Sequence, residues 1–461
     1  MLCATEEVSS FKMANVLFLA PFILYLCAVV LITLTTRTKS EDSDYFFASK
    51  RLGTVQALLS VVSSETSVAT TVVFPAAGFV GGYVLVWLLL GYIAGRSVVA
   101  FFYLRALYES SRLTIYQTIS SNHATLESAY LLAKYISGGV RFYIGGFALQ
   151  QLLGGPIALW IFVIACCVAA YSLTGGLRAV VVMDQIQSAL LVLTGVFLCS
   201  YLWLRTPAGA FEIPAFFDFD YTRATFTPVL FLGGLVLSIG SHGADQDMLL
   251  RVLSTKSFVE ARRSLVLSGF CAATLITIYI TVGYLLRYTG MPDLDPKSPL
   301  VDYVTQGNVP VLKGMFLVLL TAAAMSSLDS TIHSTGAIWK SLMNSQLIGR
   351  YWSAFSLVIM IGFALIFSII ATKQPDLLAL CMGSMNYVNG GLIGIITVFT
   401  FFRRWLNGTG VALGLIAGFL TTTTCEWALG APIPWTYTVM LSSSASFIAC
   451  MGAGVARRPS V

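Results

Sequence analysis

Residues 58–78 read LLSVVSSETSVATTVVFPAAG, an apolar segment interrupted between residues 60 and 67 by five hydroxyl side chains and the carboxylate of Glu65. Serine and threonine compete with the backbone for hydrogen bonds and so weaken a helix. This composition favours a broken helix, whose free carbonyls and hydroxyls line a cavity within a membrane. Packing of an ordinary helix through small residues is the alternative, and Glu65 weakens it.

The composition of the whole chain places this segment in a bilayer. Of its 461 residues, 57% are hydrophobic and 10% are charged, and the mean hydropathy is +0.82. Soluble domains carry about 25% charged residues, so a water-exposed globule is excluded. The net charge of +6 comes without a basic run, and nucleic acid is not an expected partner. The nine cysteines form no CxxC pair and indicate neither disulfides nor a metal site.

Thirteen segments are long and apolar enough to span a membrane, which takes about 20 residues each. The predicted spans are 14–36, 52–78, 82–108, 127–153, 157–174, 183–204, 228–250, 264–287, 310–341, 352–372, 377–401, 410–429 and 435–456. The sequence therefore predicts an all-α membrane protein that forms one domain over residues 1–461. The short stretches between spans leave no room for a soluble catalytic domain, and no nucleophile and base are spaced for catalysis, so an enzyme is not predicted.

The distribution of lysine and arginine predicts the orientation of the chain. With the N-terminus outside, most basic residues outside the spans, including Arg251, Arg262 and Arg263, fall on cytoplasmic loops. The positive-inside rule therefore predicts an outside N-terminus and a cytoplasmic C-terminus.

Two further spans carry polar groups. Residues 322–334, AAAMSSLDSTIHS, gather hydroxyls on one stripe beside Asp329, and the alanines allow another helix to approach closely. Oxygen ligands of this kind suit a hard cation such as sodium, while hydrogen bonding between helices is the alternative. Residues 238–247, SIGSHGADQD, read as a second broken helix, five spans after the first. Two breaks at matching places indicate a transporter with inverted repeats.

Two charged residues within predicted spans leave alternatives open. Arg141 lies in mid-span beside glycines, where it could clamp a carboxylate of the solute or neutralise a structural acid such as Asp184. Asp184 begins a span, and its simplest role there is that of a helix N-cap. His242, in the second break, is more simply a structural residue than a ligand.

Four stretches together resemble the sodium/solute symporter family, which includes sodium/sugar, sodium/proline and sodium/sialic acid transporters. They are DYFFASKRLG at 44–53, TGGLRAVVVMDQIQ at 174–187, DQDMLLRVLSTKSFVEARRSL at 245–265 and AAAMSSLDSTIHS at 322–334. The resemblance implies a LeuT-like core of two inverted five-helix repeats, formed by helices 2–6 and 7–11. The expected parts are an accessory helix at 14–36, repeats at 52–204 and 228–401, and two accessory helices at 410–456.

The resemblance also implies sodium sites. The site typical of the family would use backbone carbonyls near Leu59, Val62 and Ala323 with the hydroxyls of Ser326 and Ser327. A second site, found in some members, would map to Asp184, Ser326, Asp329 and Ser330. Asp329 stands where some two-sodium members have a hydroxyl, and two aspartates would over-charge one sodium ion. One of them is therefore expected to pair with an arginine or hold a proton.

The solute is expected between the two broken helices. The candidate residues there are Ser63, Glu65, Thr66, Arg141 and His242. Sodium/sugar members carry amide side chains at the first break, whereas this chain has Val61 and Thr66 nearest to it, so a sugar is disfavoured. An Arg141 that faces the cavity would favour a carboxylate-bearing solute.

The sequence thus predicts a secondary active transporter that couples sodium to symport of a small polar organic solute by alternating access. Two alternatives stay open: a proton-coupled carrier on the same fold, using Glu65 or Asp329, and a non-transporting sensor of solute and sodium. The short loops resemble those of bacterial members, so the expected location is a bacterial inner membrane. We expect lipid and solute as partners and a functional monomer.

Overall fold

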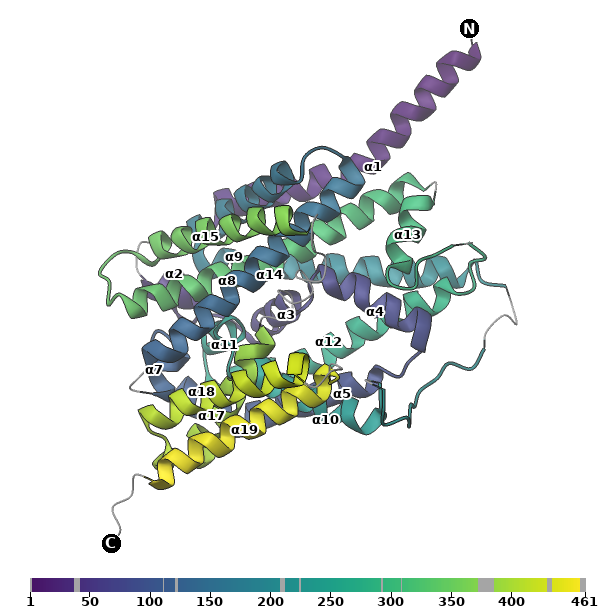
Figure 1. Ribbon diagram of the computed structural model, residues 1–461. Coiled ribbons are helices and arrows are strands. Elements are labelled where there is room, and N and C mark those ends of the chain that lie inside the picture. Colours follow the sequence, from purple (N-terminus) through teal and green to yellow (C-terminus); the bar gives the residue numbers. More distant parts are fainter. Residues whose placement is uncertain are drawn as a thin grey trace.

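The computed structural model describes residues 2–36, 42–110, 112–120, 123–207, 212–223, 225–291, 293–307, 309–371, 385–428 and 433–456. The prediction of an all-α protein is confirmed, since these residues form helices and no strand beyond an isolated bridge between Leu52 and Thr255. Helix α1 (Leu2–Thr35) projects beyond the rest of the molecule, and α19 (Trp435–Ala456) lies at the opposite side (Figure 1).

The predicted break between residues 60 and 67 is confirmed. Helix α3 (Thr54–Glu65) and helix α4 (Val68–Gly81) meet at a bend of 69°. Thr66 and Ser67 between them have extended backbone angles, with φ of −84° and −105°. The break leaves the Thr66 carbonyl outside the regular helical hydrogen-bond pattern, which frees it for another partner.

The second predicted break is also confirmed. Helix α10 (Thr227–Gly243) is followed by α11 (Gln246–Leu253), bent from it by 63°. Asp245 caps α11, because its side chain accepts a hydrogen bond from the Asp247 amide at 2.9 Å. An aspartate cap satisfies a backbone donor that a membrane interior would otherwise leave unpaired.

In the first half of the chain, the fifth and sixth predicted spans lie in one helical segment. Predicted spans 157–174 and 183–204 both lie in α9 (Ile157–Trp203), which consists of two helices that meet at a kink at Gly176, so the expected separation at 175–182 is a kink and not a loop. Gly176 has a left-handed φ of 59°, and an added Cβ would lie 2.8 Å from the Tyr45 carbonyl oxygen. Only glycine combines this backbone conformation with this close approach. The other helices here are α2 (Asp42–Phe47), α5 (Val86–Val98), α6 (Leu104–Tyr108), α7 (Ile115–Ile119) and α8 (His123–Leu153).

The second half contains α12 (Phe258–Leu286), α13 (Pro299–Gln306), α14 (Pro310–Leu342), α15 (Gly349–Ile370), α17 (Asn386–Phe401) and α18 (Gly408–Thr423). By length and composition, the described segments include eight helices that could cross a membrane, or ten if each bent pair is one span. Helices α8 and α17 are not among them, and α9 counts once. The start of the eleventh predicted span lies outside the described residues. The count of thirteen spans stays a prediction.

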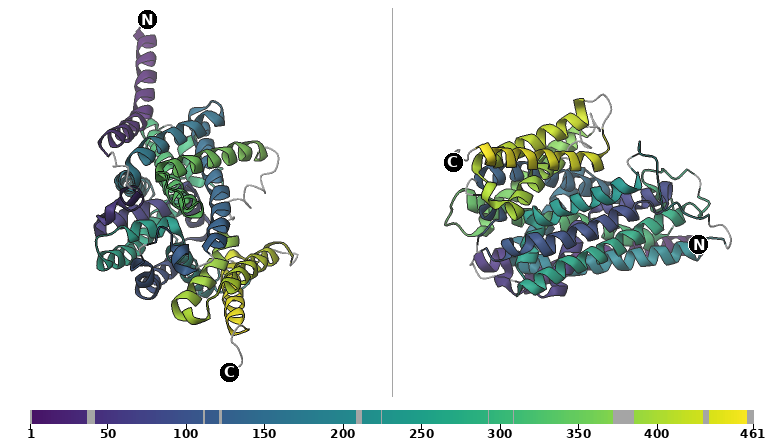
Figure 2. Two further views of the ribbon diagram at one scale, coloured as in Figure 1. Left: turned by 90° about the vertical axis from the view of Figure 1, so that its left-hand side faces the viewer. Right: turned by 90° about the horizontal axis from the view of Figure 1, so that it is seen from below.

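Helix α14 occupies the centre of the molecule, where α1, α3, α8, α9 and α15 all pack against it. Its side chains are buried almost without interruption from Phe316 to Ile338. Helices α17, α18 and α19 pack together as a group at one side, and the long helices run roughly parallel (Figure 2). This arrangement brings the α3–α4 break and the middle of α8 to the polar stretch of α14.

Candidate functional site

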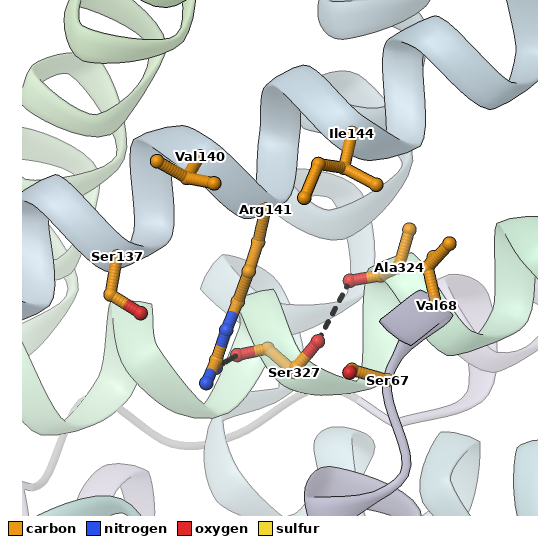
Figure 3. Close-up of a pocket in the computed structure, with 8 residues that line it drawn as sticks. All are labelled: Ser67, Val68, Ser137, Val140, Arg141, Ile144, Ala324 and Ser327. Atoms are coloured by element: carbon orange, nitrogen blue, oxygen red, sulfur yellow. Dashed lines mark hydrogen bonds between the residues drawn. The ribbon is translucent and has the colours of Figure 1, made fainter. Parts of the chain in front are cut away.

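A cavity of about 150 Å³ lies between α8, α14 and the start of α4. Its lining comprises Ser67, Val68, Ser137, Val140, Arg141, Ile144, Ala324 and Ser327 (Figure 3). Three of these side chains are hydroxyls and one is a guanidinium, while the others are apolar. A mainly apolar cavity with a few convergent polar groups is the usual form of a small-molecule site.

Arg141 extends from α8 across this cavity toward α14 (Figure 3). Its Nη1 atom donates to the Ser327 carbonyl oxygen at 3.4 Å. Of the ion pairs formed by the described residues, none includes Arg141. Asp184 pairs with Arg251 instead, so it is not an ion-pair partner of Arg141.

The polar stripe of α14 meets the break between α3 and α4. The Ser326 hydroxyl lies 3.4 Å from the Thr66 carbonyl oxygen and 3.2 Å from that of Ala323. The Ser327 hydroxyl lies 3.2 Å from the same Ala323 oxygen. Both serines are buried. These uncharged oxygens converge from two helices, a donor set that fits a hard monovalent cation.

The two other carbonyls of the expected sodium site already accept hydrogen bonds. Leu59 accepts from the Ser188 hydroxyl at 2.8 Å, and Val62 accepts from the Thr66 hydroxyl at 2.7 Å. The Val62 carbonyl also accepts from the Thr66 backbone amide at 3.1 Å, so a cation bound there would replace one of its two contacts with Thr66. The Thr66 carbonyl is a further candidate ligand, and its place at the break is the sequence signal that identifies it.

The two aspartates of the expected second sodium site share an arginine. The Arg251 Nη2 atom lies 3.1 Å from Asp184 Oδ2 and 3.7 Å from Asp329 Oδ1. All three side chains are buried. The sequence places Arg251 on a cytoplasmic loop, which is wrong: it lies in α11, one helical turn after Asp247. The positive-inside rule counts arginines without distinguishing a buried one.

Ser330 does not join this cluster through its hydroxyl. Its Oγ atom donates to the carbonyl oxygens of Ser327 at 3.2 Å and Ser326 at 3.4 Å, both on its own helix.

A second buried ionic cluster, which the sequence did not reveal, surrounds the α10–α11 break. Lys134 Nζ of α8 lies 2.9 Å from Asp245 and 2.7 Å from Asp247. The Thr331 hydroxyl of α14 donates to Asp247 at 2.9 Å, and the Tyr130 hydroxyl donates to Asp245 at 2.6 Å. These contacts tie α8, α11 and α14 together.

The remaining solute candidates lie outside the cavity lining. Glu65 forms an ion pair with Arg96 of α5, so its charge is compensated. His242 is buried, and its Nδ1 atom lies 3.1 Å from the Ser238 carbonyl oxygen of its own helix. Ser63 is also buried. Of the five solute candidates, only Arg141 lines the cavity, which adjoins the break that contains Thr66.

Comparison with known proteins agrees with this geometry. The sodium:solute symporter family model matches residues 45–418. The chain is 22% identical to the sodium/sialic acid symporter NanT of Aliivibrio fischeri, with 90% of this chain and 88% of that protein covered. It is 25% identical to the sodium/glucose cotransporter of Vibrio parahaemolyticus, over 82% and 78% of the two chains. It is 23% identical to the bovine sodium-coupled monocarboxylate transporter 2, with 90% of this chain and 72% of that protein covered.

A solved structure shares the fold. It is a sodium-coupled sialic acid symporter in a substrate-bound, outward-open state, with a TM-score of 0.86 and 19% identity over 96% of this chain and 98% of that chain. These relatives are transporters and not enzymes. The family match covers most of the sequence, including both helix breaks and the polar stripe of α14, and the chain belongs to the sodium:solute symporter family.

Proposed function

We propose that this protein carries a small carboxylate-bearing solute across a membrane together with sodium. The observation that carries the proposal is the unpaired Arg141 in a cavity beside the Ser326 and Ser327 hydroxyls. A guanidinium binds a carboxylate through two parallel hydrogen bonds. The names of several relatives, which include sialic acid and monocarboxylate transporters, support an acidic solute.

In this proposal sodium links the α3–α4 break to α14. Its ligands are the Ala323 carbonyl, the hydroxyls of Ser326 and Ser327, and the carbonyls near Leu59 and Val62, with Thr66 added by its position. Because the ligands come from two helices that must separate when the site opens, the ion favours the conformation in which they are together. A ligand shifts a conformational equilibrium only through such a difference in affinity.

The protein alternates between two states. With the N-terminus outside, the Lys134 and Arg251 clusters lie on the cytoplasmic side of the cavity and hold α8, α9, α11 and α14 together there. Solute and sodium enter from outside while these contacts are intact. The two repeats, 52–204 and 228–401, then rock against each other, the inner ionic contacts separate, and both cargoes leave inside.

The proposed location is a bacterial inner membrane, which the bacterial relatives support. The protein would work there as a monomer with lipid around it and a small-molecule solute as its partner, and it would not engage nucleic acid.

Uptake into proteoliposomes tests the proposal. Radiolabelled sialic acid, lactate and glucose are offered with an inward sodium gradient or with choline in its place. We expect sodium-dependent uptake of an acid and not of glucose, and we expect Ser327→Ala to raise the half-saturating sodium concentration. Ser330→Ala is the matched control, because that hydroxyl bonds only to its own helix.

The other outcomes distinguish the alternatives. Equal uptake without sodium, driven by an imposed pH gradient, would support a proton-coupled carrier. Sodium-dependent binding of the solute with no uptake at all would support a sensor.

A further inference from the structure

Two buried carboxylates and one buried guanidinium meet in the core of the molecule, where α9, α11 and α14 come together. Asp184 comes from α9, Asp329 from α14 and Arg251 from α11, and none is more than 1% exposed. Both carboxylates face the same nitrogen, Arg251 Nη2, at 3.1 and 3.7 Å. The guanidinium therefore lies between the two carboxylates and interacts with both.

Uncharged groups fix each member of this cluster. The Ser60 hydroxyl donates to Asp184 Oδ2 and accepts a hydrogen bond from Arg251 Nε at 2.7 Å. The Tyr171 hydroxyl donates to Asp329 Oδ2 at 2.6 Å. The Arg251 Nη1 atom donates to the Asp247 carbonyl oxygen at 2.9 Å. Arg251 is thus held by four elements and has no freedom to withdraw without breaking buried contacts.

We infer that the Arg251 side chain takes the place of a second sodium ion, so that one sodium accompanies each solute. This inference rests on the proposed sodium symport. A cation between Asp184 and Asp329 would face the guanidinium, and two like charges at such distance repel strongly in a low-dielectric interior. The Ser330 hydroxyl, which a sodium ion would recruit, is bonded to its own helix instead.

Asp329 brings a negative charge that offsets the positive charge of Arg251. With both carboxylates ionised, the cluster would contain two negative charges and one positive charge, a net charge of minus one. Removing Arg251 and Asp329 together leaves Asp184 alone, again with a net charge of minus one. The double variant Arg251→Gln, Asp329→Ser therefore keeps the charge of the buried cluster. It also opens a position with one carboxylate and several hydroxyls, which is a ligand set for sodium.

The test counts sodium ions bound to the purified full-length protein in nanodiscs, by saturation binding of radioactive sodium without any solute. We expect one ion for the unaltered protein and two for Arg251→Gln, Asp329→Ser. Asp329→Ser alone is the matched control and should stay at one, because Arg251 still pairs with Asp184. Adding Ser327→Ala to the double variant should return the count to one, which locates the gained ion outside the first site.

Each of the other results would overturn either the role of Arg251 or sodium symport itself. Two ions on the unaltered protein, or one ion on the folded double variant, would overturn the role of Arg251 and leave sodium symport standing. No bound sodium on the unaltered protein would overturn sodium symport itself. If the double variant does not fold, Arg251→Gln, Asp329→Asn keeps the shape of the Asp329 side chain and must reach two.

Discussion

Two arginines near the first helix break differ in what surrounds them. Arg96 is fully buried and paired with Glu65, whereas Arg141 is partly exposed in the cavity and has no ion pair within the described part of the chain. A buried charge that loses its partner is costly, so Arg96 and Glu65 satisfy each other, while an unpaired charge at a cavity is available to a ligand. The sequence suggested Arg141 from its position in mid-span, but it could not show which arginine Glu65 would neutralise, because pairing depends on the packing of distant helices.

At the residue scale, we expect Arg141→Gln to raise the half-saturating concentration of an acidic solute by about 10- to 150-fold. This range corresponds to the loss of roughly 1.5–3 kcal/mol for a hydrogen-bonded charged group. Arg141→Lys should fall between, because an ammonium keeps the charge and loses the bidentate geometry. The half-saturating concentration is measured from the dependence of uptake on solute concentration at saturating sodium. An unchanged value in both variants would exclude a direct role for Arg141.

Glu65→Gln should destabilise the protein by about 3–5 kcal/mol, because it leaves the buried Arg96 guanidinium unpaired. Arg96→Met in the same chain removes that charge, so the double variant should recover part of the loss. Denaturation of the single and double variants in detergent gives the coupling between the two sites. Strictly additive effects would mean that the ion pair contributes nothing.

At the scale of the elements, sequence patterns located the helices and both breaks but not every boundary. Hydroxyls beside Glu65, and the glycines around His242, mark real interruptions because these residues fail to sustain a helix at those places. The expected separation before Asp184 is present as a kink at Gly176 and not as a loop. Arg251 was assigned to a loop because hydropathy cannot reveal that the polar helix α11 is buried.

Gly283 controls how closely α12 approaches α4, the second half of the first broken helix. A Cβ atom there would lie 1.8 Å from the Pro75 carbonyl oxygen. We expect Gly283→Ala to destabilise the protein by about 1–3 kcal/mol, as overpacking does, and to slow sodium-dependent uptake by displacing α4. Thermal unfolding and transport measure the two effects.

Gly362 of α15 supplies the matched control. An added Cβ there meets no atom within 4 Å. Gly362→Ala should be neutral or stabilise the helix by up to about 1 kcal/mol. Similar losses in both variants would show that the α4–α12 contact is not special.

At the scale of the whole molecule, the number of sodium ions decides how the membrane potential acts on transport. One sodium ion moving with one monocarboxylate carries no net charge, so the potential, at about 2.3 kcal/mol per 100 mV for each charge, adds nothing. We expect uptake of a monocarboxylate into proteoliposomes to be unaffected when a potassium diffusion potential is imposed with valinomycin. Stimulation by an inside-negative potential would indicate a second sodium ion.

The way α14 is enclosed has a consequence for how the protein is made. This helix carries a carboxylate, an imidazole and many hydroxyls, yet it is surrounded by other helices and hardly touches lipid. Each ionised group at its centre would oppose entry into bare hydrocarbon by about 2.5–3.5 kcal/mol. Helices α1, α3, α8 and α9, which pack against it, all precede it in the chain. During synthesis these four helices precede α14 and can receive it as it leaves the ribosome, while α15, which also packs against it, follows.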